Sequence, residues 1–432
     1  MTNSGVSEVY QADWSPDGRN LAIIRQVEGA WRLEYPIGRV LYSAPGWISH
    51  PRVSPDGGRV AFCDHPTRGD NAGRLAVVDA QGRVRHLTES STLVWGLAWA
   101  PAGDEVWFTS ERVGGSPGIS AVTLEGSVRI VHQSTAFLFL ADLSRAGGAL
   151  VQNISPRMRL EFRAKGAAEA TELSWLEWSL ARDLTPDGRT VLFDETGPGG
   201  GLAQSVYVRD TDGSPAVRLG DGTAMRFSPD GQWVLASGSA KGAALVLMPI
   251  GVGQEIHVHL GEIHVHYAGW FPDGRSLCVV GYEPGRRQRM YRYDLERRTA
   301  QPFTDEGAGL GFCNVSPDGR FVPAAGPSGA HALYSTEGGD HVPLPSIAPD
   351  ERPISWTADG SGLYVFERNQ VPAPVHLVDI ATGRREQRLA ISPRQRSGVM
   401  GMNSICLAAD GETYAASYVQ TLGELYAVTG LR

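Results

Sequence analysis

One short turn sequence recurs along the chain and constrains its fold more than any other feature. An apolar residue is followed by Ser or Thr (Phe at position 271 in one copy), then Pro, Asp and Gly, and next by a short apolar stretch, as in residues 14–18 before Leu21. Pro presets φ near −65°, and Gly adopts the left-handed conformation that closes a type I turn with a bulge. Each copy therefore predicts a tight hairpin between two β-strands.

The turn occurs ten times, counting four looser copies, at intervals of 39 to 51 residues. Gly is kept in every copy, because a positive φ is the sterically demanding requirement of this turn. A period near 43 residues with four short strands per unit is typical of a β-propeller blade. The turns lie at residues 15–18, 54–57, 100–103, 144–147, 185–188, 228–231, 271–274, 316–319, 357–360 and 408–411.

The sequence therefore predicts an all-β protein, a β-propeller built from about ten four-stranded blades. Ten blades exceed the usual ~4–8 of one ring, so one large ring and two smaller rings are both compatible with the pattern. No linker, charge run or low-complexity stretch interrupts the period, and we expect residues 1–432 to form one continuous array. The last repeat, from Leu407, is expected to supply three strands, which leaves residues 1–8 as the candidate for closing a ring.

Charge and hydropathy exclude several classes of function. The chain has 39 Lys and Arg against 47 Asp and Glu, a formal net charge of −8, and no basic cluster, which argues against a nucleic-acid partner. No segment reaches the ~20 apolar residues of a membrane helix. The first ten residues lack the basic start and apolar run of a signal peptide. On this sequence alone we expect a cytoplasmic protein without a membrane segment.

The four cysteines lie in apolar strand segments and form no Cys-x-x-Cys pair, so we expect buried free thiols in preference to disulfides or a zinc site. They are Cys63, Cys278, Cys313 and Cys406.

Residues 256–266 are unusually rich in histidine. Two pairs alternate along strands, and with Glu262 they could converge on a metal such as zinc if the two strands formed a hairpin. The repeat instead places the first pair on an outer strand and the second on the inner strand of the next blade. We therefore predict no metal site and keep His264 and His266, near the channel, as weak metal candidates. The first pair is His257 and His259.

Two further pairs of polar residues follow the second strands of their blades, at loop positions on one face of the ring. They are Asp64 with His65, and Asp194 with Glu195. Such residues are either binding residues or solvated strand ends, and we retain them as candidates for a binding face.

Residues of two kinds recur next to the turns. An Asp directly precedes the apolar residue of several turns, which suggests hydrogen bonding between blades; these are Asp13, Asp142 and Asp183. A Trp occupies the apolar position itself in four repeats, where it is expected to fill the wedge between adjacent blades; these are Trp14, Trp99, Trp270 and Trp356.

Two motif matches lack the structural context that their chemistry needs. Residues 114–118 match the nucleophile pattern G-x-S-x-G, which requires a strand-to-helix elbow, whereas they lie between two predicted strands. Residues 198–201 are Gly-rich but lack the strand and helix of a phosphate-binding loop. We interpret both as ordinary loops.

Longer stretches around the turns resemble the WD40-like repeats of TolB-type propellers, and more closely the propeller that follows the kinase domain in many bacterial membrane-anchored serine/threonine protein kinases. The stretches are residues 12–18, 35–42, 46–51, 173–183, 211–219 and 269–274. The resemblance covers nearly the whole chain, although the Pro-Asp-Gly repeat is specific for the fold only. It implies a sensing or protein-binding module, which would be extracytoplasmic if the chain is part of such a kinase.

The kinase signatures are missing from these 432 residues, which have no Gly-rich loop before a Val-Ala-x-Lys strand and no Asp-Phe-Gly. We therefore predict a non-enzymatic propeller that binds a protein or a small molecule at one face, without a cofactor and without assigned catalytic residues. The alternative is a metal-assisted lyase or hydrolase with a site at the channel mouth, and it rests on the histidine-rich stretch.

Overall fold

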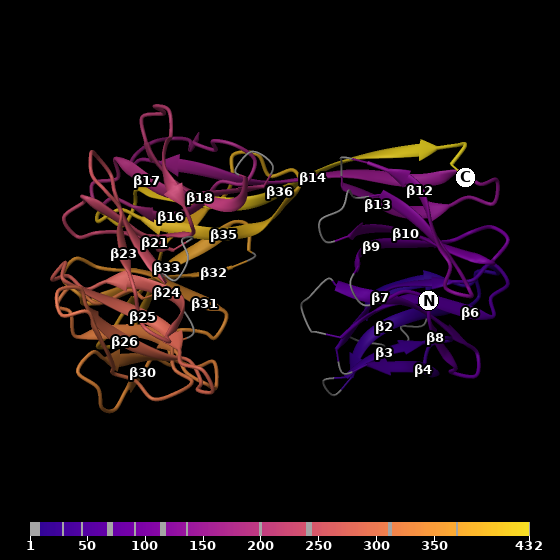
Figure 1. Cartoon of the computed structure of the whole chain (residues 1–432), viewed down its shortest axis with the longest axis horizontal. Helices are drawn as coiled ribbons and strands as arrows, with labels where there is room; N and C mark the ends of the chain where they lie inside the picture. The colour runs from indigo at the N-terminus through magenta and orange to yellow at the C-terminus, as the bar shows by residue number, and fades with distance from the viewer. Residues whose placement is uncertain are drawn as a thin grey trace. The chain divides into compact units, whose positions relative to one another are not determined.

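The computed structural model describes residues 9–27, 30–44, 46–66, 72–89, 92–112, 118–134, 137–197, 201–238, 244–309, 313–368 and 370–431. Within these ranges the chain forms strands and no helix, and most strands belong to four-stranded antiparallel sheets (Figure 1). The protein is thus all-β and a multi-bladed propeller, as predicted. The described residues include no helix long and apolar enough to cross a membrane.

The ten turns have the geometry that the sequence predicts. The Gly of each turn has φ between 65° and 79°. In the first turn the Gly18 N–H donates to the Ser15 carbonyl at 2.8 Å, and the Ser15 hydroxyl accepts from the Asn20 N–H at 2.9 Å and donates to Asp17. The side chains of Ser and Asp complete the turn, so its geometry is specified by local sequence.

The contacts divide the chain into two compact units: unit 1, Met1–Ser155 with Leu422–Arg432, and unit 2, Pro156–Thr421. The boundary falls inside two 15-residue strands, β14 (Ala149–Arg163) and β36 (Tyr414–Val428), so each unit contains part of both. The period of the turns continues through both units, and the expectation of one continuous array of repeats stays a prediction.

Unit 1 contains four blades in chain order. The first consists of β1 (Val9–Trp14), β2 (Leu21–Val27), β3 (Ala30–Glu34) and β4 (Val40–Ala44). The second consists of β5 (Trp47–Val53), β6 (Arg59–His65), β7 (Ala72–Asp79) and β8 (Val84–His86). The third consists of β9 (Thr92–Trp99), β10 (Glu105–Arg112), β11 (Gly118–Thr123) and β12 (Val128–Gln133). The fourth joins β13 (Phe137–Leu143) to the parts of β14 and β36 that belong to unit 1.

Unit 2 contains six blades. The first consists of β16 (Leu180–Leu184), β17 (Thr190–Gly197), β18 (Gly201–Asp210) and β19 (Val217–Asp221), and the second of β20 (Ala224–Phe227), β21 (Trp233–Ser237), β22 (Leu245–Pro249) and β23 (Ile256–Val258). The third consists of β24 (His264–Trp270), β25 (Ser276–Tyr282), β26 (Arg289–Asp294) and β27 (Thr299–Pro302). The fifth consists of β31 (Glu351–Trp356), β32 (Gly362–Glu367), β33 (Ala373–Asp379) and β34 (Arg385–Ile391). A three-stranded sheet, β28 (Phe321–Ala325), β29 (His331–Ser335) and β30 (Val342–Pro343), precedes the blade of β31. The sixth blade has the order β35 (Val399–Leu407), β36, β14 and β15 (Thr171–Glu172).

The ring of unit 2 closes between its sixth blade and its first. The Ser404 hydroxyl of β35 donates to the Ala181 carbonyl of β16 at 2.9 Å, which joins the sixth blade to the first. The expectation that the last repeat supplies three strands was wrong: no turn sequence interrupts residues 414–428, which continue as one strand, and β14 and β15 complete the blade. Residues 1–8, the predicted closing segment, lie outside the described residues.

Aspartates next to the turns connect neighbouring blades, as predicted, in two of the three cases. Asp13 accepts from the Val53 N–H of the next blade at 2.8 Å, and Asp183 accepts from the Phe227 N–H at 3.0 Å. Asp142 instead accepts from the N–H of its own neighbour, Leu143, at 2.8 Å. The same repeat position therefore connects blades in two repeats and bonds within its own strand in the third.

The tryptophans at the apolar position behave differently from one blade to another. Trp99 is buried and its indole donates to the Arg52 carbonyl of the preceding blade at 2.9 Å. The Trp356 indole donates to the Asn314 carbonyl at 2.9 Å in the same way. Trp14 is 60% exposed, so the predicted core role is wrong there. The four cysteines are buried and free, as predicted.

Candidate functional site

The first predicted pair lies inside a blade. Asp64 and His65 end β6 and are 4% and 1% exposed, so neither is a solvated strand end. Asp64 accepts from the guanidinium of Arg74 at 3.1 Å, and His65 stacks on Trp47 with the ring centroids 3.9 Å apart. Both residues already hold neighbouring strands together. A role at a binding face stays a prediction.

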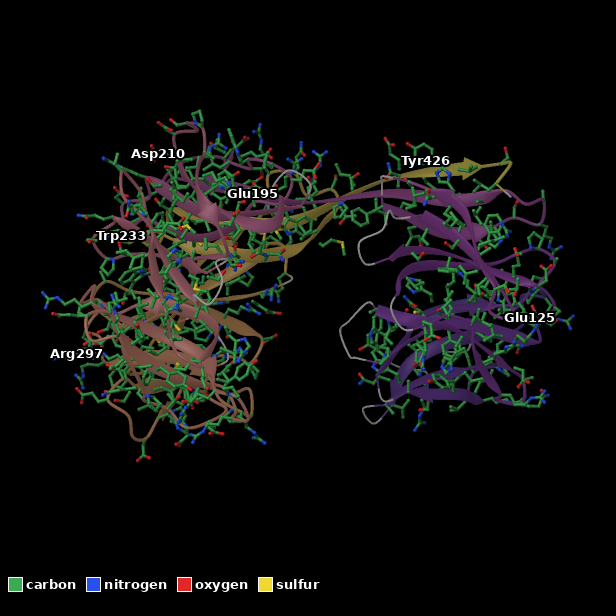
Figure 2. The ribbon with its side chains drawn as sticks, in the orientation of Figure 1. Glu125, Glu195, Asp210, Trp233, Arg297 and Tyr426 are labelled. Carbon is green, nitrogen blue, oxygen red and sulfur yellow. The ribbon has the colours of Figure 1, made fainter. Side chains whose placement is uncertain are left out.

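The second predicted pair is also buried, on β17 of unit 2. Asp194 accepts from the Arg182 guanidinium at 2.5 Å and from the Ala224 N–H at 2.6 Å. Burial raises the pKa of Asp194 to about 6, against the opposing effect of Arg182. Glu195, labelled in Figure 2, is fully buried and accepts from the Leu176 N–H at 3.0 Å. Asp194 thus joins two blades, whereas Glu195 fixes the loop before β16.

The histidine pairs are separated as the repeat predicted. His257 lies on β23, the outer strand of one blade, and His264 and His266 lie on β24, the inner strand of the next. His264 and His266 are exposed and pack against Tyr282, at centroid distances of 5.0 and 5.3 Å. Among the described residues, no group of three or more His, Cys, Asp and Glu is placed to hold a metal ion.

The two motif matches cannot be placed in the same way. Residues 114–117 of the G-x-S-x-G match and residues 198–200 of the Gly-rich loop lie outside the described residues.

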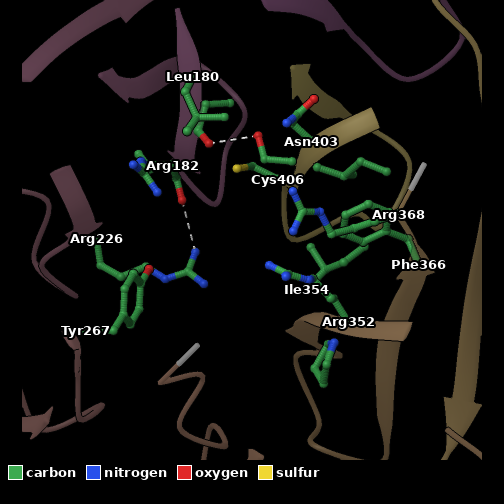
Figure 3. A pocket seen from close by; sticks show the side chains of 14 residues that line it. Leu180, Arg182, Arg226, Tyr267, Arg352, Ile354, Phe366, Arg368, Asn403 and Cys406 are labelled. Carbon is green, nitrogen blue, oxygen red and sulfur yellow. Dashed lines mark hydrogen bonds between the residues drawn. The ribbon is translucent and has the colours of Figure 1, made fainter. Parts of the chain in front are cut away.

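A cavity of about 150 Å³ opens in unit 2 where the inner strands of several blades converge (Figure 3). Residues of β16, β20, β24, β31, β32 and β35 contribute to its lining. Polar and charged side chains make up about half of the lining residues; they are Arg182, Arg226, Tyr267, Arg352, Arg368, Asn403 and Ser404. Four arginines thus line one small cavity of this acidic protein.

Two of these arginines are neutralised and fixed by carboxylates. Arg182 is paired with Asp194, and Arg226 lies 3.1 Å from Asp183. Arg226 also donates to the Asn314 amide oxygen at 2.5 Å and to the Arg182 carbonyl at 3.4 Å, the second of which is drawn in Figure 3. These bonds orient both guanidinium groups: Arg182 pairs with a carboxylate of its own blade, whereas Arg226 reaches Asp183 on the preceding blade.

The other two arginines lie on the opposite side of the cavity, toward β31 and β32 (Figure 3). Burial lowers the pKa of Arg352, and the positive charge of Arg368 lowers it further. The Nε of Arg368 is buried and has no hydrogen-bond acceptor among the described residues, nor does a described carboxylate lie within ion-pair distance of this side chain. Because guanidinium groups match carboxylate and phosphate in geometry and charge, this side of the cavity suits an anion.

Sequence reasoning missed these arginines because they lie far apart in the chain. From Arg182 to Arg368 the chain passes through several blades, and ordinary surface arginines are common in between. One signal was present: Arg226 directly precedes the apolar residue of its turn, Phe227, at the repeat position that Asp13 and Asp183 occupy in their blades.

Comparisons with known proteins add the following. No protein-family model matches the chain. It is similar to TolB from Acinetobacter baumannii, with 12% identity over 93% of this chain and 81% of that one and a TM-score of 0.25. It is also similar to an oligogalacturonate lyase in complex with manganese (13% identity, 90% and 97% coverage, TM-score 0.35) and to a prolyl endopeptidase (14%, 86% and 54%, TM-score 0.34). Similarities at this level assign no function to the chain.

Proposed function

We propose that the chain is a non-enzymatic binding propeller, and that the arginine-lined cavity of unit 2 binds the anionic group of a ligand. The observation that carries the proposal is the placement of Arg368 beside Arg352, with a buried Nε that no described acceptor reaches. A buried donor without an acceptor costs about 1–3 kcal/mol, and an anion in the cavity would remove that cost.

The size and wall of the cavity support a small carboxylate or phosphate group. Its volume of about 150 Å³ holds such a group together with a few waters. Asn403 and Tyr267 add polar atoms to the lining, and Ile354 and Phe366 exclude water from part of it. A lower effective dielectric strengthens the attraction between an anion and the guanidinium groups.

The test is isothermal titration of the full chain with citrate and with inorganic phosphate. The informative variant is Arg368→Gln, and its control is Arg297→Gln, whose side chain is 80% exposed on a turn of another blade. We expect the wild type and the control to bind one of the two anions with equal affinity, and Arg368→Gln to bind it at least about 10-fold more weakly. Equal binding by all three chains, or no binding by the wild type, would refute the proposed site.

The sequence resembles the propellers of bacterial membrane-anchored serine/threonine protein kinases, and this resemblance suggests what the binding would be for. If the chain belongs to a membrane-anchored kinase, the cavity would act as the sensor of an extracytoplasmic anion. Sequencing the DNA upstream of codon 1 tests this: a continuous frame that encodes a kinase domain and a membrane helix supports it, and a stop codon directly upstream contradicts it. The alternative of a metal-assisted lyase or hydrolase stays a prediction that no cluster in the described residues favours.

A further inference from the structure

The fourth blade of unit 1 has three strands, whereas the other three blades of this unit have four. Its outermost strand is the end of β36, residues 422–428, which lies beside β14. β35 pairs with β36 from Val399 opposite Gln420 to Leu407 opposite Tyr414, and so does not extend along residues 422–428. Within the described residues, this strand has a free edge.

A free edge presents backbone N–H and C=O groups that can pair with another strand, and proteins usually protect it with Pro, Lys or a bulge. Residues 422–428 contain neither Pro nor Lys, and their single charge is Glu424. The segment is also apolar where it meets solvent: Leu422, Leu425 and Tyr426 are 49%, 63% and 46% exposed. Figure 2 labels Tyr426 on this strand.

The sequence of this edge is complementary to itself in the antiparallel direction. With Leu425 opposite Leu425 of a second copy, Glu424 comes to lie opposite Tyr426, and Leu422 opposite Val428. No like charges face each other in this register. Glu424 and Tyr426 already form a hydrogen bond within the chain, so their side chains are compatible as neighbours on one face.

We propose that a second copy of this chain docks at this edge, with β36 against β36 across a two-fold axis, so that the sheet of the fourth blade continues into the second copy. A two-fold contact uses the same segment on both partners, which is the requirement that a self-complementary strand meets. The main-chain hydrogen bonds of strand addition supply affinity, and the apolar pairs fix the register.

The register places Leu425 on the two-fold axis, and this makes the proposal testable by charge. In either Leu425→Lys or Leu425→Glu, two like charges would face each other and weaken the dimer. In an equimolar mixture of the two variants, opposite charges would face each other and restore it. Leu425 is exposed in the single chain, so both variants should fold, and matching thermal unfolding curves would verify this.

The measurement is sedimentation velocity of the full chain up to about 200 µM, because an edge contact of this size is weak. We expect the wild type to dimerise, each variant to dimerise at least about 10-fold more weakly, and the mixture to regain the wild-type value. Val252→Lys, at a fully exposed apolar residue of unit 2, is the control and should behave as wild type.

Three outcomes would overturn the proposal. A wild type that stays monomeric would refute docking of a second copy, and a strand of another protein would then be the remaining partner for this edge. A dimer that persists in Leu425→Lys would place the contact elsewhere. A mixture that fails to recover the dimer would refute the proposed register.

Discussion

Asp183 is the carboxylate whose removal tests how the blades of unit 2 are held together. It accepts from the Phe227 N–H at 3.0 Å and from the Arg226 guanidinium at 3.1 Å, so it joins the first blade to the second. The side chains of Asp183 and Arg226 are 19% and 18% exposed, which means that water replaces the lost carboxylate poorly. Asp183→Ala would leave a backbone donor unpaired and one guanidinium charge without its carboxylate.

The magnitude follows from these two losses. An unsatisfied buried N–H costs about 1–3 kcal/mol, and breaking a fully buried ion pair costs about 3–5 kcal/mol. Arg226 is partly exposed and keeps its bonds to Asn314 and to the Arg182 carbonyl, so the second cost is reduced. We expect Asp183→Ala to lower the free energy of unfolding of unit 2 by about 3 kcal/mol.

A chain with two units need not unfold in one step, so a signal averaged over the whole chain is unsuitable. Hydrogen exchange measured by mass spectrometry across a urea series resolves peptides of β16 and β20 from those of unit 1. The loss should lower the urea midpoint of the unit 2 peptides by about 1 M. Peptides of β5 should keep their midpoint.

Two variants serve as controls for this interpretation. Asp142→Ala removes an aspartate from the same repeat position, but its hydrogen bond goes to its own Leu143, so the loss should stay below about 1 kcal/mol. Asp13→Ala removes the equivalent connection in unit 1 and should affect β5 without affecting β20. If Asp183→Ala and Asp142→Ala had equal effects, the reasoning from blade-to-blade bonding would be wrong.

Two further predictions follow from the burial of individual groups. The pKa of Asp194 is about 6 in the folded chain and about 3.8 when unfolded, so the stabilisation from its protonated carboxyl is complete below pH 4 and is lost as the pH rises to 6. The free energy of unfolding of the wild type relative to Asp194→Asn, measured by urea unfolding from pH 4 to pH 7, should therefore fall by about 3 kcal/mol. A constant difference would contradict the burial of this carboxyl. Trp356→Phe removes the indole bond to the Asn314 carbonyl and should lower stability by about 1–2 kcal/mol in the same assay, whereas Trp14→Phe, at an exposed indole, should change it by less than about 0.5 kcal/mol; the opposite order would disprove the wedge role.

The features that were predictable from sequence are those set by neighbouring residues. Gly18 and its counterparts adopt a positive φ because the turn admits no other residue as easily, and Pro and Asp complete the turn locally in the copies that contain them. Ten such turns predicted the strands and the blades, and the apolar segments around the four cysteines predicted their burial. The connection made by Asp183 was also predictable, because repeats place equivalent residues at equivalent positions.

The rest depends on strand pairing between distant segments. The sixth blade of unit 2 is completed by β14 and β15, some 250 residues before its other strands, and no local pattern marks them as its partners. The exposure of Trp14, against the burial of Trp99 at the same repeat position, is likewise set by packing between segments that lie apart in the sequence.

The amino-acid sequence by itself therefore determined the turns, the strands and the repeating blade, because steric demands and hydrophobic alternation act over a few residues. Only the tertiary structure decided which strands close the ring of unit 2, which edge of unit 1 stays open, and that Arg352 and Arg368 meet Arg182 and Arg226 around one cavity. The physical reason is that sheet hydrogen bonds are made between backbones that look alike, so the choice of partner is settled by how the whole set of blades packs.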